Sequence, residues 1–298
     1  MANSFLNFLF PCSSRSHALC VFLLLGFIAS SFGQTPDGSP EALIYWVTGK
    51  DSLKAYVFKP SPSHSEHRAA ILLFHGGAWR IGEAAWTFQR AREFAEKGMV
   101  AISIEYRLAN NGLTPIDAVE DACAAFAWAR MHARSLGIDS RRIAGYGVSA
   151  GGHLVAAAAT LPSVNGIKIQ EVSRPNALLL YSPALNMAHD NYFISLMAGK
   201  GKSEDYSPAE FISKHLPPTL IIQGEQDSIV FAADARAFRD KAVKAGASCD
   251  LEIYPGVGHL LTRNVIFQYK DFDSDPADVK DAHQKEDAFL EKLGYFAN

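Results

Sequence analysis

Short apolar runs alternate with longer helical stretches along most of the chain, and this alternation predicts strands separated by helices. The apolar runs lie at 69–74, 100–105, 142–146, 177–181, 219–223 and 250–254. The stretches with helical character span 84–96, 116–135, 150–160, 231–245 and 276–293. Strands that are joined through a crossover helix run parallel to one another. The pattern therefore predicts an α/β fold with a mostly parallel central sheet flanked by helices.

The region before this alternation has a different pattern. Two runs of period-two residues, 42–48 and 53–58, flank a glycine-containing turn, which predicts a β-hairpin. A loop rich in Pro, Ser and His follows at 59–68. His64 and His67 in this loop could suggest a metal site, but no third ligand with metal-like spacing accompanies them. We therefore predict no metal centre.

One connection is longer than an ordinary loop. About 35 residues, 183–217, separate two expected strands and mix aromatic and Met residues with polar residues and glycines. Open α/β sheets bind ligands at the carboxyl ends of their strands. We interpret the segment as a short, partial lid insertion over that edge, and a plain surface excursion is the alternative.

The N-terminus has the pattern of a secretory signal peptide. An uncharged apolar run at 18–29 follows Arg15 and precedes small residues, and it is shorter than a membrane-spanning helix requires. We predict a signal peptide at 1–33, cleavage after Gly33, and a secreted or periplasmic protein with no stable membrane association. An uncleaved anchor is the alternative. Residues 34–298 are expected to form a single domain.

Composition narrows the classes of function. The 298 residues are 48% hydrophobic and 20% charged, which suits a globular chain with a large core and excludes a disordered protein. The formal net charge is −3, and loss of the one Arg in the leader leaves 27 minus 31, or −4. A nucleic-acid partner is not expected from this charge. Of the four cysteines, Cys123 and Cys249 lie outside the leader; two separate buried thiols are expected, with a disulfide as the alternative.

A nucleophile motif lies between a predicted strand and a predicted helix. Residues 147–151 read Gly-Val-Ser-Ala-Gly, and this strand, sharp turn and helix is the context of a nucleophile elbow centred on Ser149. The glycines allow the close backbone approach that such a turn needs. A phosphate-binding loop is the competing interpretation, but the dinucleotide spacing and the Lys-Ser/Thr pair of a P-loop are absent.

A second glycine motif follows the strand at 69–74. It reads His75-Gly-Gly-Ala-Trp, and its glycines let backbone N–H groups point inward. Fixed donors of this kind stabilise the oxyanion that forms when a serine attacks an acyl carbon. The candidate donors are the N–H groups of Gly77, Ala78 and Ala150. His75 could be read as a catalytic base, but a structural role is expected.

The remaining two candidates follow strands nearer the C-terminus. Asp227 comes after the buried run at 219–223 and is the preferred orienting carboxylate, with Glu225 and Asp234 as competitors. His259 follows the strand at 250–254 on a loop rich in Pro and Gly, and is the candidate general base. The order Ser, Asp, His is that of the α/β hydrolases.

Together these motifs carry a resemblance. The segments HGGAW, SIEYRL and GYGVSAGG, followed by an Asp and a His, resemble the α/β-hydrolase superfamily over residues 42–293, and more narrowly its hormone-sensitive-lipase-like and bacterial feruloyl and acetyl esterase branch. Ala78 stands where many relatives have a third Gly, and Glu105 where many have Asp. The resemblance implies an α/β-hydrolase fold and structural roles for Arg107 and Asp121.

The predicted function is that of a serine carboxylic-ester hydrolase acting on short acyl esters. The resemblance and the leader extend this to acetyl or feruloyl groups of polysaccharides. Neither a metal nor an organic cofactor is expected, and the partner is a small or polysaccharide-borne ester. Two alternatives stay open: an amidase of the arylformamidase or peptidase type, and a catalytically silent binding protein. The sequence leaves the acyl and alcohol specificity and the oligomeric state undetermined.

Overall fold

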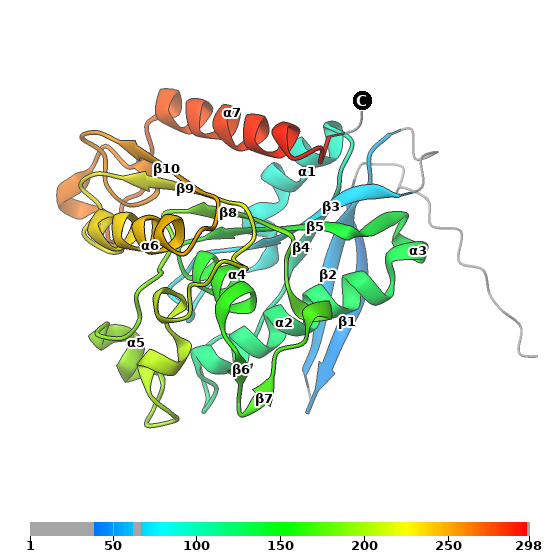
Figure 1. Cartoon of the computed structure of the whole chain (residues 1–298), viewed down its shortest axis with the longest axis horizontal. Coiled ribbons are helices and arrows are strands. Elements are labelled where there is room, and N and C mark those ends of the chain that lie inside the picture. The colour runs from blue at the N-terminus through cyan, green and yellow to red at the C-terminus, as the bar shows by residue number, and fades with distance from the viewer. Residues whose placement is uncertain (1–38, 50, 62–66, 297–298) are drawn as a thin grey trace, which may run out of the picture. The chain divides into compact units, whose positions relative to one another are not determined.

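The structure is a computed structural model that describes residues 39–49, 51–61 and 67–296 (Figure 1). The predicted signal peptide, 1–33, and His64 lie outside the described residues. An eight-stranded sheet has the order β1-β2-β4-β3-β5-β8-β9-β10. The pairs β1–β2 and β2–β4 are antiparallel, and all the other neighbouring strands of this sheet are parallel. The strands are β1 Glu41–Thr48, β2 Asp51–Phe58, β3 Arg68–Phe74, β4 Val100–Ile104, β5 Ile138–Val148, β8 Ala177–Tyr181, β9 Thr219–Gly224 and β10 Cys249–Tyr254.

Helices cover both faces of this sheet (Figure 1). Alternate residues of β3 point to opposite sides, so that Leu72 joins one hydrophobic cluster and Leu73 the other. The first cluster contains buried residues of α2, α4 and α6, and the second contains residues of α1 and α7. The predicted α/β class is therefore confirmed. The helices are α1 Phe88–Glu96, α2 Pro115–Met131, α3 Ala133–Leu136, α4 Ala150–Thr160, α5 Asn191–Leu196, α6 Ala232–Lys244 and α7 Pro276–Lys292.

Two predicted helices differ in detail from the observed ones. The stretch 84–96 begins with a 3₁₀ turn, Ala84–Thr87, before α1. The stretch 116–135 is divided at His132 into α2 and the short α3, which ends at Gly137 with a φ of 71°. That left-handed conformation favours glycine and stops the helix. A small separate hairpin, β6 Ser163–Val164 and β7 Ile167–Lys168, was not predicted.

The segment 183–217 packs firmly against the rest of the fold. It contains α5 and two 3₁₀ turns, Ser203–Tyr206 and Pro208–Glu210. Phe193 is fully buried and belongs to the core cluster beside α4. The segment follows the carboxyl end of β8, so it starts at the edge of the sheet where a lid was expected. Its role as a lid stays a prediction.

Cys123 on α2 and Cys249 on β10 are buried free thiols. Burial raises the pKa of each thiol to about 12. The expectation of two separate thiols is therefore met.

Within the described ranges, no helix has the length and apolar character needed to span a membrane.

Candidate active site

Ser149 occupies a sharp turn between β5 and α4. Its φ of 52° and ψ of −114° lie in a region that few non-glycine residues adopt. A Cβ on Gly147 would lie 2.3 Å from the carbonyl oxygen of Gly151, and a Cβ on Gly151 would lie 2.2 Å from that of Phe74. Both positions therefore require glycine. The turn holds Ser149 at the carboxyl end of β5, where its side chain faces the loops of the neighbouring strands.

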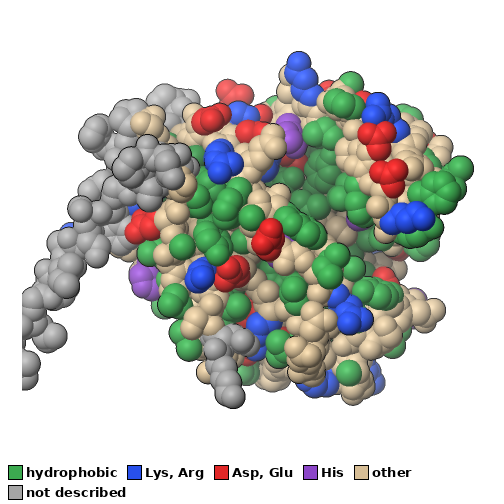
Figure 2. Space-filling view, turned by 180° about the vertical axis from the view of Figure 1, so that it is seen from behind, with side chains coloured by type: hydrophobic (Ala, Val, Ile, Leu, Met, Phe, Trp, Pro, Cys, Tyr) green, Lys and Arg blue, Asp and Glu red, His purple; other side chains and the backbone are tan. Residues whose placement is uncertain are grey.

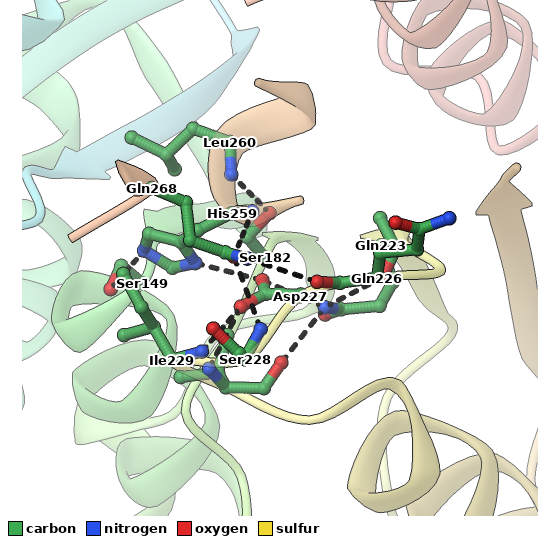
Figure 3. A network of polar contacts seen from close by, with 12 residues as sticks. Ser149, Ser182, Gln223, Gln226, Asp227, Ser228, Ile229, His259, Leu260 and Gln268 are labelled. Atoms are coloured by element: carbon green, nitrogen blue, oxygen red, sulfur yellow. Dashed lines mark hydrogen bonds and ion pairs between the residues drawn. The ribbon is translucent and has the colours of Figure 1, made fainter. Parts of the chain in front are cut away.

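The structure brings Ser149, His259 and Asp227 together (Figure 3). The Oγ atom of Ser149 lies 3.0 Å from Nε2 of His259, and Nδ1 of His259 lies 2.8 Å from Oδ2 of Asp227. All three residues are buried. They come from the ends of β5, β10 and β9, and parallel strands of one sheet end at the same edge. The arrangement can move a proton from the hydroxyl to the imidazole and stabilise the resulting charge.

Asp227 is held by donors on both of its oxygens. Oδ1 accepts hydrogen bonds from the backbone N–H groups of Ile229 and Val230, both at 2.9 Å. Oδ2 accepts one from Nε2 of Gln223, also at 2.9 Å. These bonds keep Oδ2 directed at the imidazole of His259. The donors come from the end of β9 and from the turn that follows it, so the same turn that delivers the carboxylate also orients it.

The two competing carboxylates lie elsewhere. Glu225 is exposed and accepts a 3.4 Å hydrogen bond from the backbone N–H of Gly256. Asp234 lies on α6 and accepts a hydrogen bond from the side chain of Asn186. In the described part of the chain, neither carboxylate hydrogen-bonds to His259, so the geometry favours Asp227 as the orienting acid.

The loop after β3 passes directly beside Ser149. A Cβ on Gly76 would lie 3.4 Å from the Cβ of Ser149. Gly77 has a φ of 115°, and a side chain there would collide with the carbonyl of Ile81. Within the described residues, the N–H groups of Gly77 and Ala78 donate no hydrogen bond to another protein group. The N–H of Ala150, at the first position of α4, has no intrahelical acceptor.

His75 begins this loop, and within the described residues it makes no hydrogen bond to Ser149. Its ring stacks on Tyr106 with centroids 4.3 Å apart, and the Tyr106 hydroxyl donates to the His75 carbonyl at 2.9 Å. Burial lowers the pKa of His75 to about 4. A buried, neutral ring that packs beneath the loop is a structural support, as the sequence suggested.

Arg107 and Asp121 form a buried pair outside the site. The Nε atom of Arg107 lies 2.9 Å from Oδ1 of Asp121, whose other oxygen accepts from the Arg107 backbone N–H. Burial raises the pKa of Asp121 to about 6, although the guanidinium opposes this shift. The pair links α2 to the chain that follows β4, which agrees with the structural role that the resemblance implied.

Sequence reasoning missed two residues at the site. Gln268 is buried beside His259 and Asp227 (Figure 3). Phe272 places its ring centroid 6.1 Å from that of His259 and is 47% exposed. Both lie between β10 and α7 in a segment without strand or helix periodicity, so no local signal marked them.

Within the part of the chain that is described, no cluster of three or more His, Cys, Asp or Glu could hold a metal ion.

Comparison with known proteins identifies the family of the chain. A family model described as alpha/beta hydrolase fold matches residues 71–263. The chain belongs to the α/β-hydrolase family. The predicted superfamily and fold are therefore confirmed, and its relatives include esterases, as the hormone-sensitive-lipase-like resemblance implied. The narrower feruloyl and acetyl esterase branch stays a prediction.

Two curated relatives match this chain over only part of their own lengths. An arylesterase of Saccharolobus solfataricus is 32% identical over 198 residues, which are 60% of this chain and 64% of that protein. The isoprenylcysteine alpha-carbonyl methylesterase ICME of Arabidopsis thaliana is 25% identical over 242 residues, 73% of this chain and 56% of that protein. This α/β hydrolase thus spans less than two thirds of either relative.

A solved structure matches over nearly its whole length. The apo form of esterase 2 from Thermogutta terrifontis has a TM-score of 0.78 and 29% identity, covering 87% of this chain and 96% of that one. The propionate-bound form of the same esterase has a TM-score of 0.75, with the same coverage. The similarity therefore extends beyond the nucleophile motif to the complete hydrolase fold.

Proposed function

We propose that this α/β hydrolase is a serine carboxylic-ester hydrolase that acts through an acyl-enzyme. The proposal depends on one observation, that the imidazole of His259 lies within hydrogen-bond distance of both Asp227, at 2.8 Å, and Ser149, at 3.0 Å. Ser149 is the nucleophile, His259 the general base and acid, and Asp227 the group that orients the imidazole. The esterases among the relatives support the same activity.

The chemistry proceeds in two halves. The Oγ of Ser149 bonds to the acyl carbon while its proton passes to Nε2 of His259. The carbonyl oxygen becomes an oxyanion, for which the N–H groups of Gly77, Ala78 and Ala150 are the proposed donors. The bond between the acyl carbon and the alkoxy oxygen then breaks, and His259 protonates that oxygen, so that the alcohol leaves. In the second half, water gives its proton to His259, its hydroxyl bonds to the acyl carbon, and Ser149 leaves with its proton restored.

The proposed substrates are short acyl esters. Structures of the Thermogutta terrifontis esterase have propionate or butyrate bound. Figure 2 shows hydrophobic side chains gathered around a hollow on one face of this chain. Apolar ester groups suit such surfaces. Large exposed hydrophobic residues on the loops that contain or follow site residues are Ile81, Trp86, Ile229, Phe231, Ile266, Phe267, Tyr269 and Phe272.

We further propose an extracellular ester, such as an acetyl or feruloyl group on a polysaccharide. The predicted leader supports this location, and the sequence resemblance supports the substrate class. A panel of nitrophenyl esters of increasing acyl length, run beside acetylated and feruloylated xylan, tests both levels. Release of acids from xylan is the expected result. Turnover confined to nitrophenyl esters would remove the polysaccharide proposal, and faster turnover of N-formylkynurenine would favour the amidase alternative.

The nucleophile itself is tested without knowledge of the substrate. The Thermogutta terrifontis esterase has been solved phosphorylated by paraoxon. With this chain, we expect paraoxon to form a bond between phosphorus and the Oγ of Ser149, with release of nitrophenolate. Intact and peptide mass spectrometry would locate the adduct. Ser149→Ala should prevent it and abolish ester turnover without unfolding the protein. Ester turnover that survives in this variant would contradict the assignment, and an unreactive wild type would favour a silent binding protein.

A further inference from the structure

A loop of fourteen positions, residues 262–275, connects the His259 turn to α7, and we refer to it as the post-histidine loop. An antiparallel bridge between Thr262 and Ser274 closes it at its base. The exposed side chains of Arg263 and Asp273 pair beside that bridge. Most of the loop is exposed or half-buried, but Gln268 is only 2% exposed. A buried glutamine in an exposed loop must have its polar atoms paired.

The Gln268 amide makes four hydrogen bonds, which is its full capacity. Its Oε1 accepts from the backbone N–H of His259 at 2.8 Å and from that of Ser228 at 3.1 Å. Its Nε2 donates to the carbonyl of Gln226 at 3.1 Å and to that of Val265 at 2.8 Å. Figure 3 shows the amide between the two loops that supply His259 and Asp227.

The hydrogen-bond partners of this amide lie on the backbone next to the two proposed catalytic residues Asp227 and His259. Gln226 and Ser228 are the residues on either side of Asp227, so the amide holds the backbone before and after the acid. A third bond holds the backbone N–H of His259 itself. We infer that Gln268 is a positioning residue, which sets the distance between the loop of the acid and the loop of the base. The inference rests on the proposed function of this site.

The local sequence is adapted to the amide. A Cβ on Gly258 would lie 2.7 Å from Oε1 of Gln268, so a side chain at that position would displace the amide. This glycine therefore leaves the space that the Gln268 amide occupies. Without the amide, the buried N–H of His259 and the partly buried N–H of Ser228 would lose their acceptor.

The test compares three variants of the full chain. Gln268→Met keeps the length of the side chain and removes all four hydrogen bonds. Gly258→Ala displaces the amide without changing its chemistry. Thr87→Val is the matched control, because Thr87 is equally buried and hydrogen-bonded through its hydroxyl to Ser103, but lies outside the site. Steady-state kinetics with a nitrophenyl ester and thermal unfolding are measured for each variant.

We expect kcat to fall about 10- to 100-fold in Gln268→Met and in Gly258→Ala, with KM changing much less, because misplacement of reacting groups slows the chemical step. Thr87→Val should lose stability and keep its kcat. Wild-type kcat in folded Gln268→Met, or a loss confined to stability, would overturn the inference. If Gln268→Met does not fold, Gly258→Ala decides on the same criterion.

A second readout separates this inference from the proposed function. We expect the imidazole proton between His259 and Asp227 to give a downfield proton resonance, which should disappear in His259→Ala. We expect this resonance to shift or broaden in Gln268→Met and Gly258→Ala, but not in Thr87→Val. If the wild type hydrolyses no ester, the proposed function fails, and the resonance still decides whether Gln268 positions His259. An unchanged resonance in both variants would contradict the positioning role.

Discussion

At the scale of single residues, Ser149 shows how a strained conformation is maintained. Its backbone N–H donates to the carbonyl of Tyr181 at 2.9 Å, and its carbonyl accepts from the N–H groups of His153 and Ala184, both at 3.2 Å. A backbone outlier of this kind costs about 1–3 kcal/mol and persists only where its surroundings determine it. Here a neighbouring strand, a helix and the segment after β8 all contribute to holding it.

The role of Asp227 gives a prediction at the same scale. Asp227→Asn should lower kcat by about 10³- to 10⁴-fold, because an amide cannot accept from Ile229, Val230 and Gln223 and also accept the imidazole proton. Kinetics with a nitrophenyl ester would measure the loss. Glu225→Gln is the control, since it removes an exposed carboxylate two positions away and should keep most of the activity. A similar loss in both variants would leave the acid unassigned.

At the scale of elements, buried polar side chains join segments that are distant in sequence. The imidazole of His153 on α4 accepts from the Trp79 indole at 3.2 Å and donates through Nε2 to the Tyr206 carbonyl at 2.8 Å. Phe193 of α5 packs edge-on against both the Trp79 and the His153 rings. The segment 183–217 is thereby tied to α4 and to the loop that contains the proposed oxyanion donors.

A buried ion pair joins α1 to α7 and predicts how stability depends on pH. Arg90 contacts Glu286 at 2.7 Å, and Glu286 is fully buried. Burial raises the pKa of Glu286 to about 7, although Arg90 opposes the shift. Since the folded state then binds more protons than the unfolded state between pH 4.5 and 7, this group makes the free energy of unfolding fall as the pH rises through that window.

Glu286→Gln should remove this dependence. The free energy of unfolding of the variant, relative to the wild type, should rise by about 3 kcal/mol from pH 4.5 to about pH 8 and then stay constant. Urea unfolding at several pH values would measure it. Glu291→Gln, which removes an exposed carboxylate from the same helix, controls for the change in net charge. A constant difference between Glu286→Gln and the wild type across this range would contradict the prediction.

At the scale of the whole molecule, the sheet organises both the core and the site. Its two faces are covered by different sets of helices, and each face has its own hydrophobic cluster. The carboxyl ends of β5, β9 and β10 bring together three residues that are separated by up to 110 positions. The core and the site therefore depend on the same parallel arrangement, which agrees with the placement of ligand sites in open α/β sheets.

The N-terminal leader gives a prediction for the whole chain. We propose that residues 1–33 direct export and are then removed. Expression of the full chain in a secreting host should yield a protein outside the cytoplasm whose first residue is Gln34, as N-terminal sequencing would show. A chain that begins at Gln34 when synthesised in the cytoplasm serves as the reference for size and activity. Recovery of the full-length chain in the membrane fraction would favour the uncleaved anchor.

Local patterns predicted most of the elements, because helix and strand periodicity depends on residues close in sequence. The helix 150–160 and the strand 177–181 match α4 and β8 residue for residue. The break at His132 was missed because the apolar pattern continues across it. The hairpin β6–β7 was missed because strands of two residues show no periodicity. The structure of the post-histidine loop was missed for a different reason, because it depends on contacts between Gln268 and other loops.

The sequence by itself determined the α/β class, the order of elements and the candidate residues Ser149, Asp227 and His259, because each follows a strand in a locally recognisable turn. Only the tertiary structure decided the order of strands, which carboxylate faces His259, and the place of Gln268. The amide of Gln268 meets the N–H of Ser228 across 40 positions of chain. Such partners are selected by the packing of the folded sheet and its loops, and a local pattern does not encode them.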